Sequence, residues 1–148
     1  MILDVLKRIN LSEAITTHFK WNEALLLREW NFAAYPTDSQ KYFIFQMALK
    51  LEDISQLFGG QSILIMSWLR PKQYDNFIKH RDLNFESGSR HCSGKAVDFN
   101  VFGYEPEAVR KVLLDHLDRL QVRMELETSD WIHLDIDWKP GACNTFLP

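Results

Sequence analysis

Two histidines and one aspartate carry the clearest chemical signal in the sequence: His91, Asp98 and His133. They belong to an ordered pattern, S-x-H-x-x-G-x-A-x-D over residues 89–98, followed downstream by W-x-H over residues 131–133. Imidazole nitrogens and a carboxylate oxygen are ligands that zinc favours, and three protein ligands leave a fourth position open for water, as in catalytic sites. An isolated histidine and aspartate are more often a packed histidine and a surface carboxylate. The ordered pattern instead predicts one Zn²⁺ bound by these three residues.

The first half of the pattern has a local structure that would bring two ligands together. Gly94 permits a tight turn just after His91. Residues 96–102 then alternate between apolar and polar side chains, as in a strand with one buried face. Asp98 belongs to the polar set, so a turn followed by this strand can bring His91 and Asp98 to one metal ion.

The third ligand belongs to a predicted β-hairpin at residues 120–136. The alternation of side chains places Glu125 on the polar face of its first strand and His133 on the polar face of the second. A three-residue turn at 128–130 pairs Glu125 with His133, with their Cβ atoms about 5 Å apart. A turn of two or four residues would instead place the apolar Met124 opposite His133.

A hydrolytic zinc site also needs a carboxylate that takes a proton from water and passes it to the leaving group. The hairpin register favours Glu125 for this role. Asp130, in the turn, ranks second because its side chain is shorter, and Glu127, one step along the same face, ranks third. The alternative for Glu125 is a solvated strand carboxylate.

Arg70 is the candidate for binding an anionic group of a substrate. It follows the apolar run 63–66 and precedes Pro71, which would end a strand and expose the arginine. A guanidinium binds a carboxylate through two parallel hydrogen bonds or stabilises an oxyanion. The alternative is an ordinary surface arginine at the end of a strand.

The remaining segments predict an α+β fold in one domain, residues 1–148, with a small antiparallel sheet, helices on one face and the zinc groove on the other. An aromatic-rich arm or flap is expected over residues 1–35, with a short helix within 22–30. A helix should begin at the Thr37–Gln40 capping box and end before Gly59, and a strand should follow within 61–67. A loop over 72–88 should form a cleft wall, and a last helix should begin at Pro106 and continue to Leu120.

Composition excludes several classes of protein. The chain of 148 residues has a formal net charge of −3 and no basic run, which argues against a nucleic-acid partner. No apolar stretch reaches transmembrane length and the N-terminus lacks a signal-peptide pattern, so we expect synthesis in the cytoplasm and no membrane partner. Cys92 and Cys143 form no disulfide framework. We expect a monomer.

The pattern resembles the zinc D-Ala-D-Ala carboxypeptidase superfamily, which includes L-alanyl-D-glutamate endolysins of phages and the hedgehog zinc-binding domain. The resemblance covers nearly the whole chain and is closest to the small phage or prophage members. It rests on residues 89–98 and 131–135, and extends to Ser67–Pro71, 18–23 and 144–148.

The resemblance implies zinc on His91, Asp98 and His133, with Arg70 and Ser89 contacting substrate. The superfamily's base is most often a glutamate three residues before the last histidine. This chain departs there, because Asp130 occupies that position and the tryptophan lies two residues before the histidine. Members with an isoleucine directly before that histidine place the base farther upstream, which agrees with a base on the first hairpin strand.

These features together predict a zinc metallopeptidase that hydrolyses peptide bonds in peptidoglycan stem peptides, as a carboxypeptidase or an endopeptidase. Its setting would be cell-wall degradation, with access to the wall after release or within a phage particle. The alternative is a binding module that keeps the zinc site and has lost hydrolysis. A plain interaction domain without metal is a third and weaker hypothesis.

Overall fold

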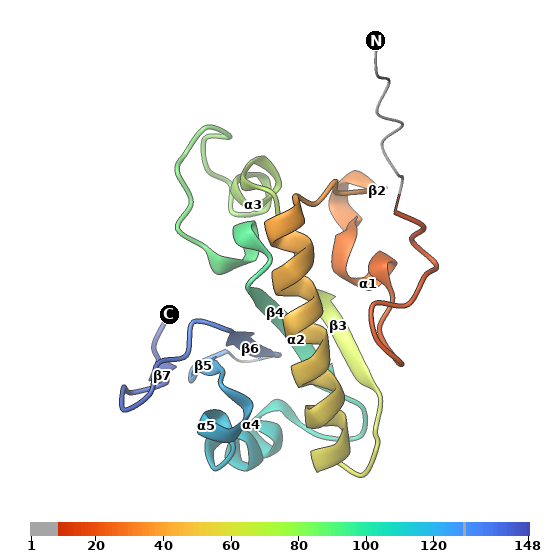
Figure 1. Ribbon diagram of the computed structural model, residues 1–148. Helices are drawn as coiled ribbons and strands as arrows, with labels where there is room; N and C mark the ends of the chain where they lie inside the picture. The colour runs from red at the N-terminus through yellow and green to blue at the C-terminus, as the bar shows by residue number, and fades with distance from the viewer. Residues whose placement is uncertain (1–8, 129) are drawn as a thin grey trace.

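The computed structural model describes residues 9–128 and 130–148 and shows an α+β fold built on one five-stranded sheet (Figure 1). The strand order is β3-β4-β6-β5-β7, and every neighbouring pair is antiparallel except β5 and β7, which run parallel. The strands are β3 (Ile63–Ser67), β4 (Ala96–Val101), β5 (Arg123–Glu125), β6 (Ile132–Asp135) and β7 (Thr145–Phe146). The predicted fold class is confirmed.

Helices cover one face of this sheet and form the core with it. The long helix α2 (Asp38–Leu57) lies lengthwise across the strands, while α4 and α5 lie at one end of it (Figure 1). Alternate side chains of β4 face these helices and are fully buried, among them Val97 and Phe99. The other side chains of the strand, including Asp98 and Asn100, therefore belong to the opposite face of the sheet.

Helix α2 begins where the sequence predicts. The Thr37 hydroxyl accepts a hydrogen bond from the Gln40 amide, and the Gln40 side chain accepts one from the Thr37 amide, which completes the capping box. The Gln40 side-chain amide also donates to the Cys92 carbonyl, at 3.0 Å. Gly94 packs so closely on this helix that an added Cβ would lie 3.1 Å from the Gln40 carbonyl oxygen. The start of α2 thereby supports the turn that carries His91.

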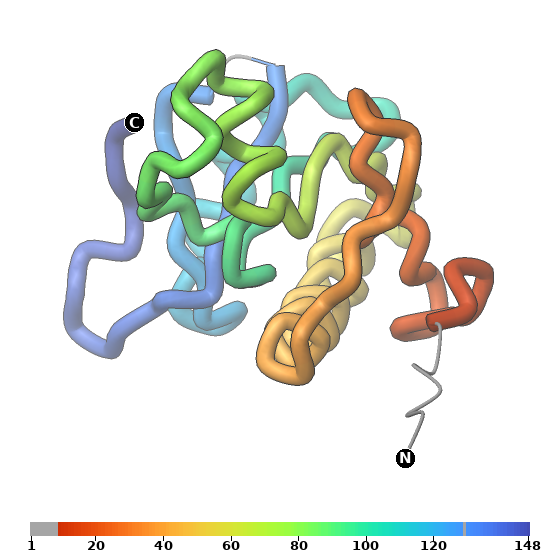
Figure 2. Tube along the Cα trace, turned by 90° about the horizontal axis from the view of Figure 1, so that it is seen from above, coloured from red at the N-terminus to blue at the C-terminus, as the bar shows by residue number. Residues whose placement is uncertain are grey.

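The N-terminal arm packs on the edge of the sheet next to β3. It contains α1 (Trp21–Leu25), β1 (Leu26–Leu27), the 3₁₀ helix η1 (Arg28–Trp30) and β2 (Phe32–Ala33). Phe19 and Leu25 are buried in the core, and the Leu69 amide donates to the Ala24 carbonyl at 3.1 Å. In Figure 2 this arm and the C-terminal segment lie on opposite sides of α2. Residues 1–8 of the predicted arm lie outside the described residues.

The prediction of a loop over residues 72–88 is wrong in its first half. Residues Lys72–Ile78 form the helix α3, although the segment is polar. Asp75 and Asn76 are fully buried, and the side-chain amide of Asn76 donates to the carbonyls of Leu83 and Phe85. The polar side chains of this helix therefore bind the following loop. Local polarity in the sequence does not show that these side chains are buried.

The helix that begins at Pro106 is shorter than predicted. Helix α4 (Pro106–Leu114) ends before His116, and α5 (Leu117–Leu120) follows as a separate turn. A ring nitrogen of His116 lies 2.9 Å from the carbonyl oxygen of Val112. This contact satisfies a carbonyl at the helix end, where no further helical amide is available.

The predicted hairpin register is confirmed. Arg123 pairs with Asp135 and Met124 pairs with Leu134. Continued by one residue, this register would set Glu125 opposite His133. The first strand begins at Arg123 rather than 120, because Leu120 belongs to α5. Ser129, in the predicted turn, lies outside the described residues.

Candidate metal centre

Three elements bring the predicted ligands to one point on the open face of the sheet. His91 lies in the 3₁₀ helix η2 (Arg90–Ser93), which ends at Gly94 with a φ of 80°, in the left-handed region that glycine adopts without strain. Asp98 lies on β4 and pairs directly with His133 on β6. His91, Asp98 and His133 form a group that could hold a metal ion.

Two of the three separations between the donor atoms match those of a tetrahedral metal site. His91 Nε2 lies 3.2 Å from Asp98 Oδ1 and 3.3 Å from His133 Nδ1. Zinc–ligand bonds of about 2.0 Å place tetrahedral donors about 3.3 Å apart, so both separations match. The third pair, His133 Nδ1 and Asp98 Oδ1, is 2.7 Å apart, a hydrogen-bond distance.

A hydrogen bond at Nδ1 of His91 determines that Nε2 is the ring nitrogen that faces the site. His91 Nδ1 lies 2.7 Å from the backbone carbonyl oxygen of Trp68, so this nitrogen carries the proton and donates it. The lone pair of Nε2 then points at Asp98 and His133. Burial lowers the pKa of His91 and keeps the imidazole in its neutral form, which is the form that binds metal.

Asp98 is buried yet held ionised by its neighbours. Burial alone would raise its pKa, but a hydrogen bond from His133 and the polar contact with His91 hold the pKa of this carboxyl well below its usual range. A β-bulge in the adjoining strand lies beside it, because the register shifts between Ile65 and Ser67 opposite Asp98. Bulges of this kind turn side chains toward a site at the edge of a sheet.

Arg70 lies beside the ligand group rather than free in solvent. Its Nη1 lies 3.9 Å from Asp98 Oδ2, and its Nε lies 3.1 Å from Asp75 Oδ1, at an angle that does not make a hydrogen bond. Its backbone amide donates to the His91 carbonyl at 3.0 Å. The arginine thus joins α3, η2 and the candidate ligands.

Ser89 caps η2 and so helps to orient His91. Its hydroxyl accepts a hydrogen bond from the His91 amide at 3.3 Å, and its own amide donates to the Ser87 hydroxyl at 3.2 Å. The predicted contact of Ser89 with a substrate stays a prediction.

The ligand group opens into a hollow of about 540 Å³, here called the metal-site hollow. Its lining residues come from both ends of α3, from η2, from β4, from the hairpin and from β7. They include Arg70, Lys79, Arg81, Ser89, Arg90, His91, Asp98, Glu125, Trp131, His133 and Phe146. Glu125, the first-ranked base, therefore shares this hollow with the ligands. Asp130 lines a separate hollow, where its carbonyl accepts a hydrogen bond from Asn100 at 2.9 Å, and Glu127 is exposed.

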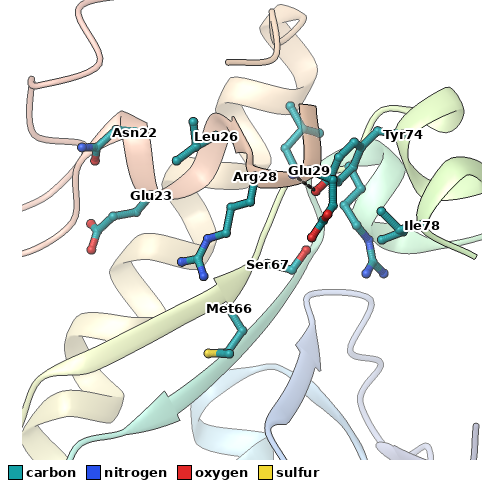
Figure 3. A pocket seen from close by; sticks show the side chains of 11 residues that line it. Asn22, Glu23, Leu26, Arg28, Glu29, Met66, Ser67, Tyr74 and Ile78 are labelled. Carbon is teal, nitrogen blue, oxygen red and sulfur yellow. Dashed lines mark hydrogen bonds between the residues drawn. The ribbon is translucent and has the colours of Figure 1, made fainter. Parts of the chain in front are cut away.

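A second hollow, of about 440 Å³, lies under the N-terminal arm and shares Arg70 with the metal-site hollow. Arg28 crosses toward β3, where its guanidinium donates to the Ile65 carbonyl at 3.0 Å, and Ser67 and Met66 lie close by (Figure 3). The Glu29 amide donates to the Tyr74 hydroxyl (Figure 3). The two hollows give the open face of the sheet space on both sides of Arg70.

Sequence reasoning missed the ion-pair cluster behind the metal-site hollow. Asp75 is fully buried and lies within 3.1 Å of nitrogen atoms of Arg70, Lys79 and Arg81. The spacing of Asp75 and Lys79, one helical turn apart, was the available signal, but it requires the segment to be recognised as a helix.

Cys92 and Cys143 are both free, a point that the sequence left open. Within residues 9–128 and 130–148, no helix is long and apolar enough to cross a membrane. Comparisons of the chain with family models, with curated proteins and with solved structures find no match.

Proposed function

We propose that this chain is a zinc metallopeptidase that hydrolyses peptide bonds in peptidoglycan stem peptides. The observation that carries the proposal is the convergence of His91, Asp98 and His133 in one hollow that Arg70 and Glu125 also line. Two imidazoles and one carboxylate form the open ligand set of catalytic zinc sites. The sequence pattern resembling the zinc D-Ala-D-Ala carboxypeptidase superfamily supplies the substrate class.

Zinc bound by these residues supplies Lewis acidity for a carbonyl group and lowers the pKa of water. Contacts outside the ligand group hold the ligand side chains in position. The Trp68 carbonyl orients the His91 ring, as outer hydrogen bonds do for metal-binding histidines. His133 packs edge-on against Phe146, with ring centroids 5.8 Å apart, which restricts its rotation.

Arg70 would bind the substrate carboxylate beside the ligand group. Its side chain is 13% exposed, and its position between Asp75 and Asp98 fixes the direction of the guanidinium. A guanidinium held in this way loses little conformational entropy when it binds a carboxylate. A peptide whose carboxylate binds Arg70 would have its adjacent peptide bond beside the ligand group.

Glu125 would move the proton. The hairpin register, continued by one pair beyond Met124 and Leu134, sets it opposite His133. It also lines the metal-site hollow, so its carboxylate would reach water held beside the ligands. In this role it takes a proton from the attacking water and passes it to the leaving amine. Glu127, two residues after the end of the strand, is exposed and serves as a control.

Digestion of muropeptides by the zinc-supplemented protein tests the proposal. Mass spectrometry should show one defined cleavage that disappears with chelator and returns when zinc is restored. Glu125→Gln should lower the rate by about 10²–10⁴-fold, while Glu127→Gln should leave it near that of the wild type. Intact muropeptides with zinc present would refute the peptidase.

A zinc-binding recognition module is the second candidate function. It is favoured by the position of Asp130, which stands where the resembling proteins most often carry their base and which lines a different hollow. Such a module would bind zinc and stem peptides without cutting them. The muropeptide digestion separates the two candidates, because a module shows no turnover for Glu125→Gln to remove.

A further inference from the structure

The wall of the metal-site hollow that follows α3 carries more positive than negative charge. Asp75 Oδ2 accepts hydrogen bonds from Lys79 Nζ at 3.0 Å, Arg81 Nη2 at 2.8 Å and the Ser87 hydroxyl at 2.7 Å. Asp75 Oδ1 lies 3.1 Å from Arg70 Nε. One buried carboxylate therefore lies against three cationic side chains, and Arg70 also lies 3.9 Å from Asp98 Oδ2. Three cations and two carboxylates leave an excess of one positive charge, and Asp98 contacts neither Lys79 nor Arg81 in an ion pair among the described residues.

The ion pairs on the other side of the ligand group use aspartates of the hairpin and the segment after it. Arg90 pairs with Asp137 at 2.8 Å, and Arg123 binds Asp135 through two hydrogen bonds of 2.8 and 2.6 Å. Lys95 lies 3.2 Å from Asp137. Two carboxylates serve three cations here as well. The two sides differ in that Lys79 and Arg81 line the metal-site hollow, whereas Lys95 and Arg123 do not.

We propose that Lys79 and Arg81 form a second carboxylate-binding site in the metal-site hollow, so that the chain binds peptides carrying two carboxylates. One carboxylate contacts Arg70 and the other contacts Lys79 and Arg81. The inference rests on the proposed function for its class of ligand, a peptide, and on the charge of the wall for the second anionic group.

Both side chains have the exposure and the donors that the role requires. The Lys79 and Arg81 side chains are 38% and 31% exposed, so each is held at one side and open at the other. The Lys79 ammonium uses one of its donors on Asp75. The Arg81 guanidinium donates to Asp75 and to the Ser87 hydroxyl through the same nitrogen, Nη2. The Arg81 guanidinium also stacks on the Phe85 ring, 4.6 Å from its centroid, which keeps the group in place before a ligand arrives.

Binding of matched peptides tests the site. The probe is the tripeptide L-Ala-γ-D-Glu-L-Ala, with two free carboxylates and with its peptide nitrogens methylated so that no bond is cut during calorimetric titration. Two comparison peptides each have one of these carboxylates converted to a carboxamide. The zinc-supplemented wild type should bind the dicarboxylate about tenfold more tightly than either comparison peptide, as expected for one charge-assisted contact.

Variants assign that preference to the proposed residues. Lys79→Gln and Arg81→Gln should each reduce the affinity for the dicarboxylate about tenfold, and Lys79→Arg should restore it. Lys72→Gln is the matched control, because Lys72 lies on the same helix, is 41% exposed and pairs with Glu86 outside the hollow. The control should bind like the wild type. If both glutamine variants keep the wild-type preference, the second site is refuted.

The titration separates this inference from the proposed function. A protein that prefers the dicarboxylate but leaves muropeptides intact has the second site and is not a peptidase. A protein that cleaves muropeptides but binds all three peptides equally is a peptidase without the second site.

Discussion

Two buried carboxylates, Asp75 and Asp98, lie on either side of Arg70 and have opposite surroundings. Asp75 is 0% exposed and Asp98 is 6% exposed. Asp75 lies among the cationic side chains of Arg70, Lys79 and Arg81. Asp98 lies against two imidazole rings and only loosely approaches the arginine, at 3.9 Å.

The difference in nearby positive charge indicates which carboxylate is suited to bind a metal ion. Arginine and lysine keep their charge when partly buried, so Asp75 is neutralised within the fold. Asp98 has only the distant Arg70 guanidinium as a fixed cation among the described residues, so fuller neutralisation needs a proton on an imidazole or a cation among the donor atoms. Burial lowers the pKa of His91 and disfavours the first of these. Asp75 therefore acts as a structural anchor, and Asp98 has the surroundings of a metal ligand.

Removal of the Asp98 carboxylate should have the largest effect. Asp98→Ala deletes one of three ligands, and the loss in zinc affinity should exceed the roughly 100-fold seen for outer-shell changes. Competition with a zinc-binding dye measures it. Wild-type affinity in this variant would show that zinc binds elsewhere.

Removal of the Asp75 charge should instead weaken the fold and spare the metal site. Asp75→Asn leaves Arg70 and its partners without a buried counter-ion, at a cost of about 3 kcal/mol in the free energy of unfolding by urea. Zinc affinity should change by less than about tenfold. Asp115→Asn, at an exposed aspartate, is the control and should unfold like the wild type. Loss of zinc from Asp75→Asn without loss of stability would reverse the roles of the two carboxylates.

The pH dependence of stability should show the smallest effect. Burial would raise the pKa of Asp75, but hydrogen bonds from Ser87 and Lys79 and the charge of Arg70 lower it below the ordinary value of 3.8. A depressed pKa in the folded state contributes stability above the unfolded pKa and loses it as pH falls through the folded pKa. The stability difference between wild type and Asp75→Asn should therefore shrink below about pH 4, by about 1.4 kcal/mol per unit of pKa shift. Urea unfolding at several pH values measures it, and a difference that grows in acid would contradict the assignment.

The sequence was most informative where local periodicity decides the structure. The ligand positions follow from a glycine turn, from alternation along β4 and from parity in the hairpin, and each of these depends on neighbouring residues. Pairing of Arg123 with Asp135 confirms the register that ranked Glu125 first. The role of Glu125 as base remains a prediction.

Structure decided by distant partners could not be predicted in the same way. Helix α3 buries Asp75 and Asn76 because Arg81, Ser87 and the carbonyls of the following loop satisfy them. Short-range patterns do not show that these polar residues are buried, so the segment resembled a loop. The parallel pairing of β5 with β7 likewise depends on a return of the chain that no turn motif specifies.

X-ray absorption spectroscopy of the zinc-supplemented protein tests the central claim most directly. About one zinc per chain should be bound, with nitrogen and oxygen neighbours at about 2.0–2.2 Å from His91, Asp98 and His133. A protein that binds no zinc, or one whose zinc has a sulfur neighbour at about 2.3 Å from Cys92 or Cys143, would contradict the proposed centre.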